Sequence, residues 1–119
     1  MGQTLIFWNE RADAQTVVLY TAPIDFSSVR DATAFLTILA VGTATATIIA
    51  EESIDPNNPN SWSSVGGTAT GSATGNFKAL VGGATGGTTN TVGPFVRFRA
   101  TIAVTSGGIT WSGGAVLRS

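Results

Sequence analysis

The most regular pattern in the chain is a two-residue alternation over residues 95–104. One side of this segment carries Val96, Phe98, Ala100, Ile102 and Val104, and the other side carries Phe95, Arg97, Arg99 and Thr101. Successive side chains of a β-strand point to opposite faces of its sheet. The alternation therefore predicts a strand with one face in a hydrophobic core and a cationic face toward water or a partner.

Seven other short runs are rich in Val, Ile, Thr and aromatic residues, which favour strands. They cover residues 4–8, 16–20, 33–41, 44–51, 61–65, 76–81 and 109–117. Turn-forming residues separate them at 21–23, 41–43, 55–60 and 106–108. The Ser-Gly-Gly at 106–108 predicts a hairpin that pairs the last two strands with each other. The best helix candidate, residues 27–33, is too short for more than one turn.

These patterns predict one all-β domain over residues 1–119, with about eight strands. A sheet with one apolar face needs a second layer to cover it, so the expected architecture is an antiparallel β-sandwich. Jelly-roll and immunoglobulin-like strand orders both fit.

Two segments, residues 66–75 and 82–90, consist almost entirely of Gly, Thr, Ala and Ser. Such composition buries little surface to offset the entropy of ordering, which favours long mobile surface loops. The alternative is that these segments order against neighbouring subunits, because small side chains let backbones approach closely.

The composition narrows the function classes. Only 11% of the 119 residues are charged, and the net charge is −1, so nucleic acid is not an expected partner. The chain has no Cys and no His, which removes disulfides, Cys-based zinc sites and the usual base at neutral pH. Neutral polar side chains cost little to desolvate and suit close packing against neighbours.

The first residues, Met-Gly-Gln-Thr-Leu-Ile, contain neither the basic region of a signal peptide nor a Ser or Thr at position 6 for myristoylation. No apolar run approaches the roughly 18 residues of a membrane span. We expect no membrane association.

Acidic residues gather from Glu51 to Asp55, and the Pro- and Asn-rich segment continues to Asn60. Its oxygen atoms suit a hard cation, but an EF-hand would need Gly at Asn60 and Glu at Gly66. We therefore expect a rigid turn and no metal site.

Glu51 and Glu52 are adjacent on a strand and point to opposite faces, which argues against a carboxylate pair for glycoside hydrolysis. Without His there is no Ser-His-Asp triad, and Lys78 is the lone lysine for a Ser-Lys variant. Neither Gly-rich segment has the Lys of a phosphate loop. We expect no catalytic residues, no cofactor and no enzyme activity.

The three tryptophans, Trp8, Trp62 and Trp111, are candidates for a sugar-stacking platform. The favoured interpretation is core or interface, since Trp111 shares a strand face with Ile109 and Leu117.

Arg97 and Arg99 are either solvated or paired with carboxylates of a neighbouring strand or subunit. Exposed apolar patches that mark contact surfaces are expected at Phe95 and at the Phe7-Trp8 pair. The apolar residues Phe35, Leu36, Ile38, Leu39 and Val41 cover both faces of one strand. We therefore expect the chain to bury one face on a second sheet and another on a partner.

Three segments carry a family resemblance: residues 44–53, which end in Glu-Glu-Ser before an Asp-containing turn, then 61–65 with Trp62, then 95–101 with Phe-Val-Arg-Phe-Arg. Over residues 33–118 this resembles small β-sandwich proteins of tailed bacteriophages, which are virion components such as head-decoration and tail-associated proteins. The longer Pro-containing turn and the Gly/Thr-rich insertions depart from that pattern.

The resemblance implies a non-enzymatic virion structural protein, made in the host cytoplasm and placed on the capsid surface. Its partners would be the major capsid protein or other virion proteins, and it would be a homo-oligomer or bound at lattice sites. The alternative is a carbohydrate-binding or adhesin-like module that uses Trp62 or the 55–60 segment.

Overall fold

A computed structural model describes residues 2–13, 15–85, 88–90 and 93–118. The described chain is all-β and antiparallel, with extents of 40 × 30 × 23 Å. Its strands are β1 (Gly2–Ala12), β2 (Gln15–Tyr20), β3 (Ile24–Asp25), β4 (Asp31–Ser53), β5 (Ser63–Gly71), β6 (Gly75–Thr85), β7 (Thr88–Asn90) and β8 (Phe95–Arg118).

Two long strands, β4 and β8, form the centre of the sheet and pair with each other from Asp31↔Arg118 to Ser53↔Phe95. On its other side β8 pairs with β1, β2 and β3, and β4 pairs on its other side with β5 and β6. These seven strands make one sheet, and β7 pairs with the end of β6.

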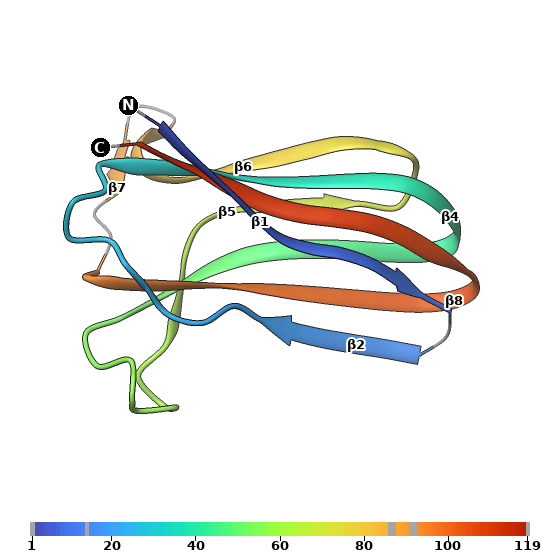
Figure 1. Ribbon diagram of the computed structural model, residues 1–119, viewed down its shortest axis with the longest axis horizontal. Coiled ribbons are helices and arrows are strands. Elements are labelled where there is room, and N and C mark those ends of the chain that lie inside the picture. Colours follow the sequence, from blue (N-terminus) through green and yellow to red (C-terminus); the bar gives the residue numbers. More distant parts are fainter. Residues whose placement is uncertain (1, 14, 86–87, 91–92, 119) are drawn as a thin grey trace.

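The two central strands both bend at the same end of the molecule (Figure 1). The bend divides the sheet into two arms. The first arm contains β1, residues 109–118 of β8, residues 31–41 of β4, and β6. The second arm contains β2, β3, residues 95–104 of β8, residues 44–53 of β4, and β5.

Glycines make this bend possible. Gly107 and Gly108 have φ angles of +76° and +69°, a conformation that L side chains rarely adopt. Opposite them, a Cβ on Gly42 would lie 2.5 Å from the carbonyl oxygen of Ser106. The predicted hairpin at 106–108 is therefore wrong: β8 continues through it, and its two halves pair with β4 rather than with each other. Residues 41–43 likewise bend β4 without ending it.

The alternation in residues 95–104 is confirmed, since Val96, Phe98, Ala100 and Ile102 are fully buried. The core also takes Leu36 and Ile38 from the first arm and Ile48 from the second. The two arms meet where the Phe7 ring of β1 stacks on Phe98 of β8 at 5.3 Å between centroids. The ring centroids of Trp8 and Trp111 are 5.6 Å apart.

Three further expectations need correction. Residues 66–71 are not a loop, because they extend β5 and pair with β4. Of the second Gly/Thr-rich segment, 82–85 belong to β6 and 88–90 form β7, while Gly86 and Gly87 lie outside the described residues. The Phe7-Trp8 pair is not an exposed patch: Trp8 is buried and Phe7 is half-buried against the core.

Residues 27–28 form a turn, as expected, closed by a hydrogen bond from the Val29 N–H to the Phe26 carbonyl. Within the described ranges, the chain has no helix long and apolar enough to cross a membrane.

Candidate functional site

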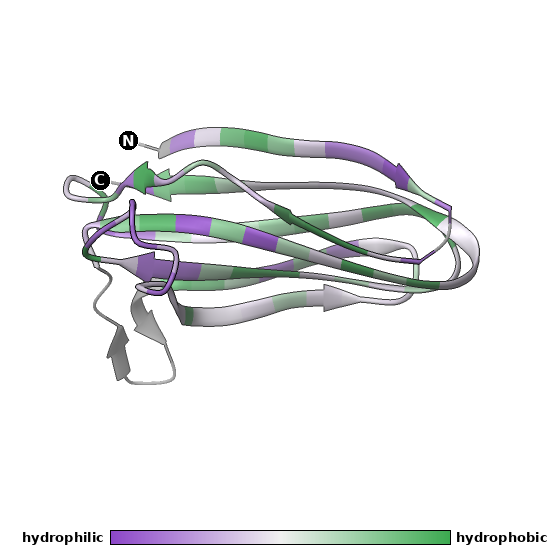
Figure 2. Ribbon diagram, turned by 90° about the horizontal axis from the view of Figure 1, so that it is seen from below, coloured by the Kyte–Doolittle hydropathy of each residue, from purple (hydrophilic) through white to green (hydrophobic). Residues whose placement is uncertain are grey.

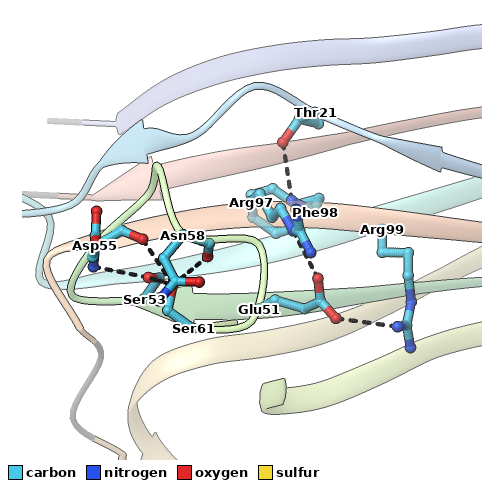
Figure 3. A network of polar contacts seen from close by, with 9 residues as sticks. All are labelled: Thr21, Glu51, Ser53, Asp55, Asn58, Ser61, Arg97, Phe98 and Arg99. Carbon is cyan, nitrogen blue, oxygen red and sulfur yellow. Dashed lines mark hydrogen bonds and ion pairs between the residues drawn. The ribbon is translucent and has the colours of Figure 1, made fainter. Parts of the chain in front are cut away.

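The outer surface of the second arm carries a charged cluster around Glu51 (Figure 3). The register pairs Glu51 of β4 with Arg97 of β8, so the two side chains project from the same face. Arg97 Nε donates to Glu51 Oε1 at 2.8 Å, and Arg99 Nη1 donates to Glu51 Oε2 at 3.1 Å. Glu51 is only 6% exposed. The predicted pairing of Arg97 and Arg99 with a carboxylate of a neighbouring strand is confirmed.

Two aromatic rings flank this cluster. The Arg97 guanidinium carbon lies 4.3 Å from the centroid of the Tyr20 ring and 4.4 Å from that of Trp62. Guanidinium groups are attracted to the faces of aromatic rings, and the effect grows as water is excluded. Arg97 therefore covers part of the ring surface of the half-buried Trp62, while Tyr20 remains exposed.

Glu52 takes no part in the cluster, and its Oε1 accepts a hydrogen bond from the Gly93 N–H at 2.6 Å. The expectation that Glu51 and Glu52 serve different faces is confirmed. Two carboxylates that act on opposite sides of a strand do not share one substrate.

The connection between β4 and β5 is a hydrogen-bonded turn, largely hydrophilic in colour in Figure 2. The Asp55 side chain accepts from the Asn57 N–H, and the Asn58 side chain accepts from the Asn60 N–H. The Ser61 hydroxyl lies 2.7 Å from the carbonyl oxygens of both Asp55 and Asn58 (Figure 3). The predicted turn held by side-chain hydrogen bonds is confirmed. In the described ranges no group of three or more acidic residues is placed to hold a metal ion.

The outer surface of the first arm is apolar across its middle. One cross-strand row consists of Ile6, Gly114, Phe35 and Lys78, and the row beside it of Thr4, Val116, Thr33 and Leu80. Ile6 is 73% exposed, Leu80 42% and Phe35 39%. We call Ile6, Phe35, Leu80 and Val116 the outer apolar face.

Two grooves interrupt this face. Gly114 has no side chain between Ile6 and Phe35, and a groove of about 210 Å³ lies there. A second groove of about 460 Å³ lies between Phe35 and Leu80. Lys78 is the one charged residue in the two rows, and Arg118 also lines the second groove, so covering this face would desolvate little charge.

At one end of the first arm, Asp31 binds two arginines. It accepts a hydrogen bond from Arg118 Nε at 2.5 Å and from Arg30 Nε at 3.1 Å. Burial by itself would raise the pKa of Asp31, but the hydrogen bonds and charges of Arg118 and Arg30 outweigh it and hold that pKa below its ordinary value of 3.8. This cluster ties the start of β4 to the end of β8.

The structure places the three tryptophans in two environments. Trp8 and Trp111 lie in the core, as favoured from the sequence, and only Trp62 reaches the surface. The sequence placed Phe35 and Leu39 in a strand that is apolar on both faces, and both are exposed. Ile6 and Leu80 are exposed too, which the sequence did not indicate. The missing signal was the strand register, because the rows join residues more than 20 positions apart.

Comparison with known proteins identifies no relative of this chain. No protein-family model matches the sequence, and no curated protein is significantly similar to it.

Proposed function

We propose that this chain is a non-enzymatic structural protein of a bacteriophage virion, a capsid decoration or stabilising protein that binds the major capsid protein lattice. The observation that carries this proposal is the outer apolar face. Exposed Ile, Phe and Leu side chains in adjacent rows of one sheet surface are typical of a protein contact surface.

The low charge of this face, where Lys78 and Arg118 line one groove, supports the same function. A surface of Thr, Gly and apolar groups is desolvated at low cost when it meets a partner. Binding at many equivalent lattice sites, as part of an oligomer or a lattice-bound array, multiplies weak contacts through avidity. The function requires no cofactor, metal, nucleic acid or membrane.

For the fold, we propose that the bent sheet is a jelly-roll sandwich. The two arms would be its layers, with the orders β1–β8–β4–β6 and β2–β8–β4–β5. Support comes from the pairing register and from Phe7 and Phe98, which stack across the interior. Jelly-rolls recur in viral capsid proteins and in lectins, so this fold assignment is an analogy that suits either function.

The test is co-sedimentation with capsids of the phage whose genome encodes the chain. Phe35→Asp combined with Leu80→Asp should abolish co-sedimentation, because it places two charges in the interface. Val18→Asp is the matched control: Val18 is 47% exposed on the second arm, and its substitution should leave binding unchanged.

Thermal melting shows whether each variant is folded at the assay temperature. If the wild-type chain does not co-sediment, or if the folded double variant binds like wild type, the proposal fails.

The second candidate is a carbohydrate-binding or adhesin-like module. Tyr20 and Trp62 lie together on the second arm and present aromatic surface near the 55–60 turn. A glycan array separates the two functions. Glycan binding that is lost in Trp62→Ala, without any capsid association, would favour the module, whereas a silent array would exclude it.

A further inference from the structure

A pocket of about 550 Å³ opens between β1 and β2, where the edges of the two arms diverge. Its floor is apolar, made by Val17 and Leu19 of β2 with Ile102 and Trp111 of β8. On the other side of the molecule the arms meet closely, since a Cβ on Gly66 of β5 would lie 2.6 Å from the Leu80 carbonyl oxygen of β6. A pocket of this size suits a ligand or a long side chain.

Three charged residues line this pocket, the exposed Glu10 and the Arg11–Asp13 pair. Glu10 is the cross-strand partner of Trp111, and such partners project from the same face of a sheet. Trp111 faces the interior, so Glu10 points to that side and lines the pocket. Among the described residues no ion-pair partner reaches Glu10, whereas the neighbouring Asp13 is paired with Arg11 at 2.9 Å.

Trp111 also lines the pocket, and its indole N–H is unpaired. Trp111 is almost completely buried, and its Nε1 makes no hydrogen bond within the described chain. That nitrogen is closed to solvent, so it is not a binding group of the pocket.

The two walls of the pocket are strand edges. In the part of the chain that the structure describes, β1 and β2 each pair with β8 and with no strand on the other side. Their outer edges therefore offer backbone N–H and C=O groups to an added strand. A free edge beside a side-chain pocket is the combination that binds extended peptides.

We propose that this pocket receives a Lys or Arg side chain from an extended segment of a partner protein. The aliphatic stem packs on Val17, Leu19 and Ile102, and the cation reaches the carboxylate of Glu10. The flanking backbone of the segment adds to a strand edge. The site is separate from the outer apolar face, so either proposal can fail without the other.

The test is an NMR titration of the ¹⁵N-labelled protein with the peptide acetyl-Ala-Val-Lys-Val-Ala-amide. The assigned Trp111 indole signal should move saturably. A peptide with norleucine in place of Lys keeps the aliphatic stem and lacks the charge. Its affinity should be lower by at least about tenfold. Glu10→Gln should weaken binding of the Lys peptide by a similar factor. Asp55→Asn, which removes an exposed carboxylate far from the pocket, should have no effect.

Three results would overturn the proposal. They are a Trp111 signal that does not move, a norleucine peptide that binds as well as the Lys peptide, and a natively folded Glu10→Gln variant that binds like wild type. A shift of the same signal on raising the protein concentration, without peptide, would assign the pocket to a second copy of this chain.

Discussion

Glu51 shows at the level of one residue how a buried charge is retained on a sheet surface. Its two carboxylate oxygens serve two different arginines, and Arg97 in turn lies against Tyr20 and Trp62. A buried carboxylate is tolerated only when its acceptors are satisfied, and here both are.

Replacing Glu51 with Gln should therefore lower the free energy of unfolding by about 2 kcal/mol. The amide keeps one acceptor and turns a donor toward the second arginine. Urea denaturation measures the loss. Asp13→Asn is the matched control, because Asp13 is 79% exposed in its pair with Arg11 and should contribute less than about 0.5 kcal/mol. Equal effects of the two substitutions would show that the Glu51 cluster is not structural.

The lowered pKa of Asp31 predicts that the stability of the fold depends on pH. Its pKa is lower in the folded chain than the ordinary value of 3.8, so the ionised form stabilises the fold above pH 3.8. That contribution is lost as the pH falls through the lowered pKa, when Asp31 takes up a proton. The difference in unfolding free energy between wild type and Asp31→Asn should shrink below pH 3.8. A difference that stays constant from neutral pH into this acid range would contradict the assignment.

At the level of the element, the bend in β4 and β8 determines how the sheet is arranged. Gly42 faces the 106–108 backbone so closely that no side chain fits between the strands. Each central strand thus passes from one arm to the other without interrupting its pairing for more than a few residues.

Gly42→Ala should destabilise the chain by about 2 kcal/mol, because its Cβ would have to push the opposing backbone away. Gly67→Ala is the control: this glycine lies in β5, and its Cβ would make its nearest contact at 3.4 Å, with the Ala79 Cβ. Thermal unfolding of the two variants gives the comparison. Equal melting temperatures would mean that the bend does not depend on a glycine at position 42.

The elements themselves were predictable from the sequence, because alternation is a local property. Seven of the eight predicted runs lie within strands, and the run 61–65 overlaps β5 from Ser63 on. Trp111, Ile109 and Leu117 are all buried, as expected. The pairing was not predictable. The Ser-Gly-Gly sequence is compatible with both a hairpin and a bent strand. The close approach of Gly42, which is distant in sequence, belongs to the bent strand. Gly66 and Gly67 were assigned to a loop for a similar reason, since their strand is stabilised by pairing with β4.

The candidate sites depend even more on register. The sequence suggested that Arg97 and Arg99 could pair with a carboxylate of a neighbouring strand. The strand register shows that this carboxylate belongs to Glu51. The register also placed the exposed Glu10 opposite Trp111 at the pocket, which could not be recognised before the β1–β8 pairing was known.

At the level of the whole molecule, the two arms differ in their outer surfaces. The second arm carries the Glu51 cluster with Tyr20 and Trp62, and the first arm carries the outer apolar face. This asymmetry is expected for a protein that docks one surface on a lattice and turns the other toward solvent.

A cryo-electron microscopy map of the virion is the decisive test of the proposed capsid role. We expect density for the chain at repeated sites on the capsid, with Phe35 and Leu80 against the major capsid protein and Tyr20 facing away from it. A virion without this chain, or a map in which the outer apolar face points into solvent, would contradict the account.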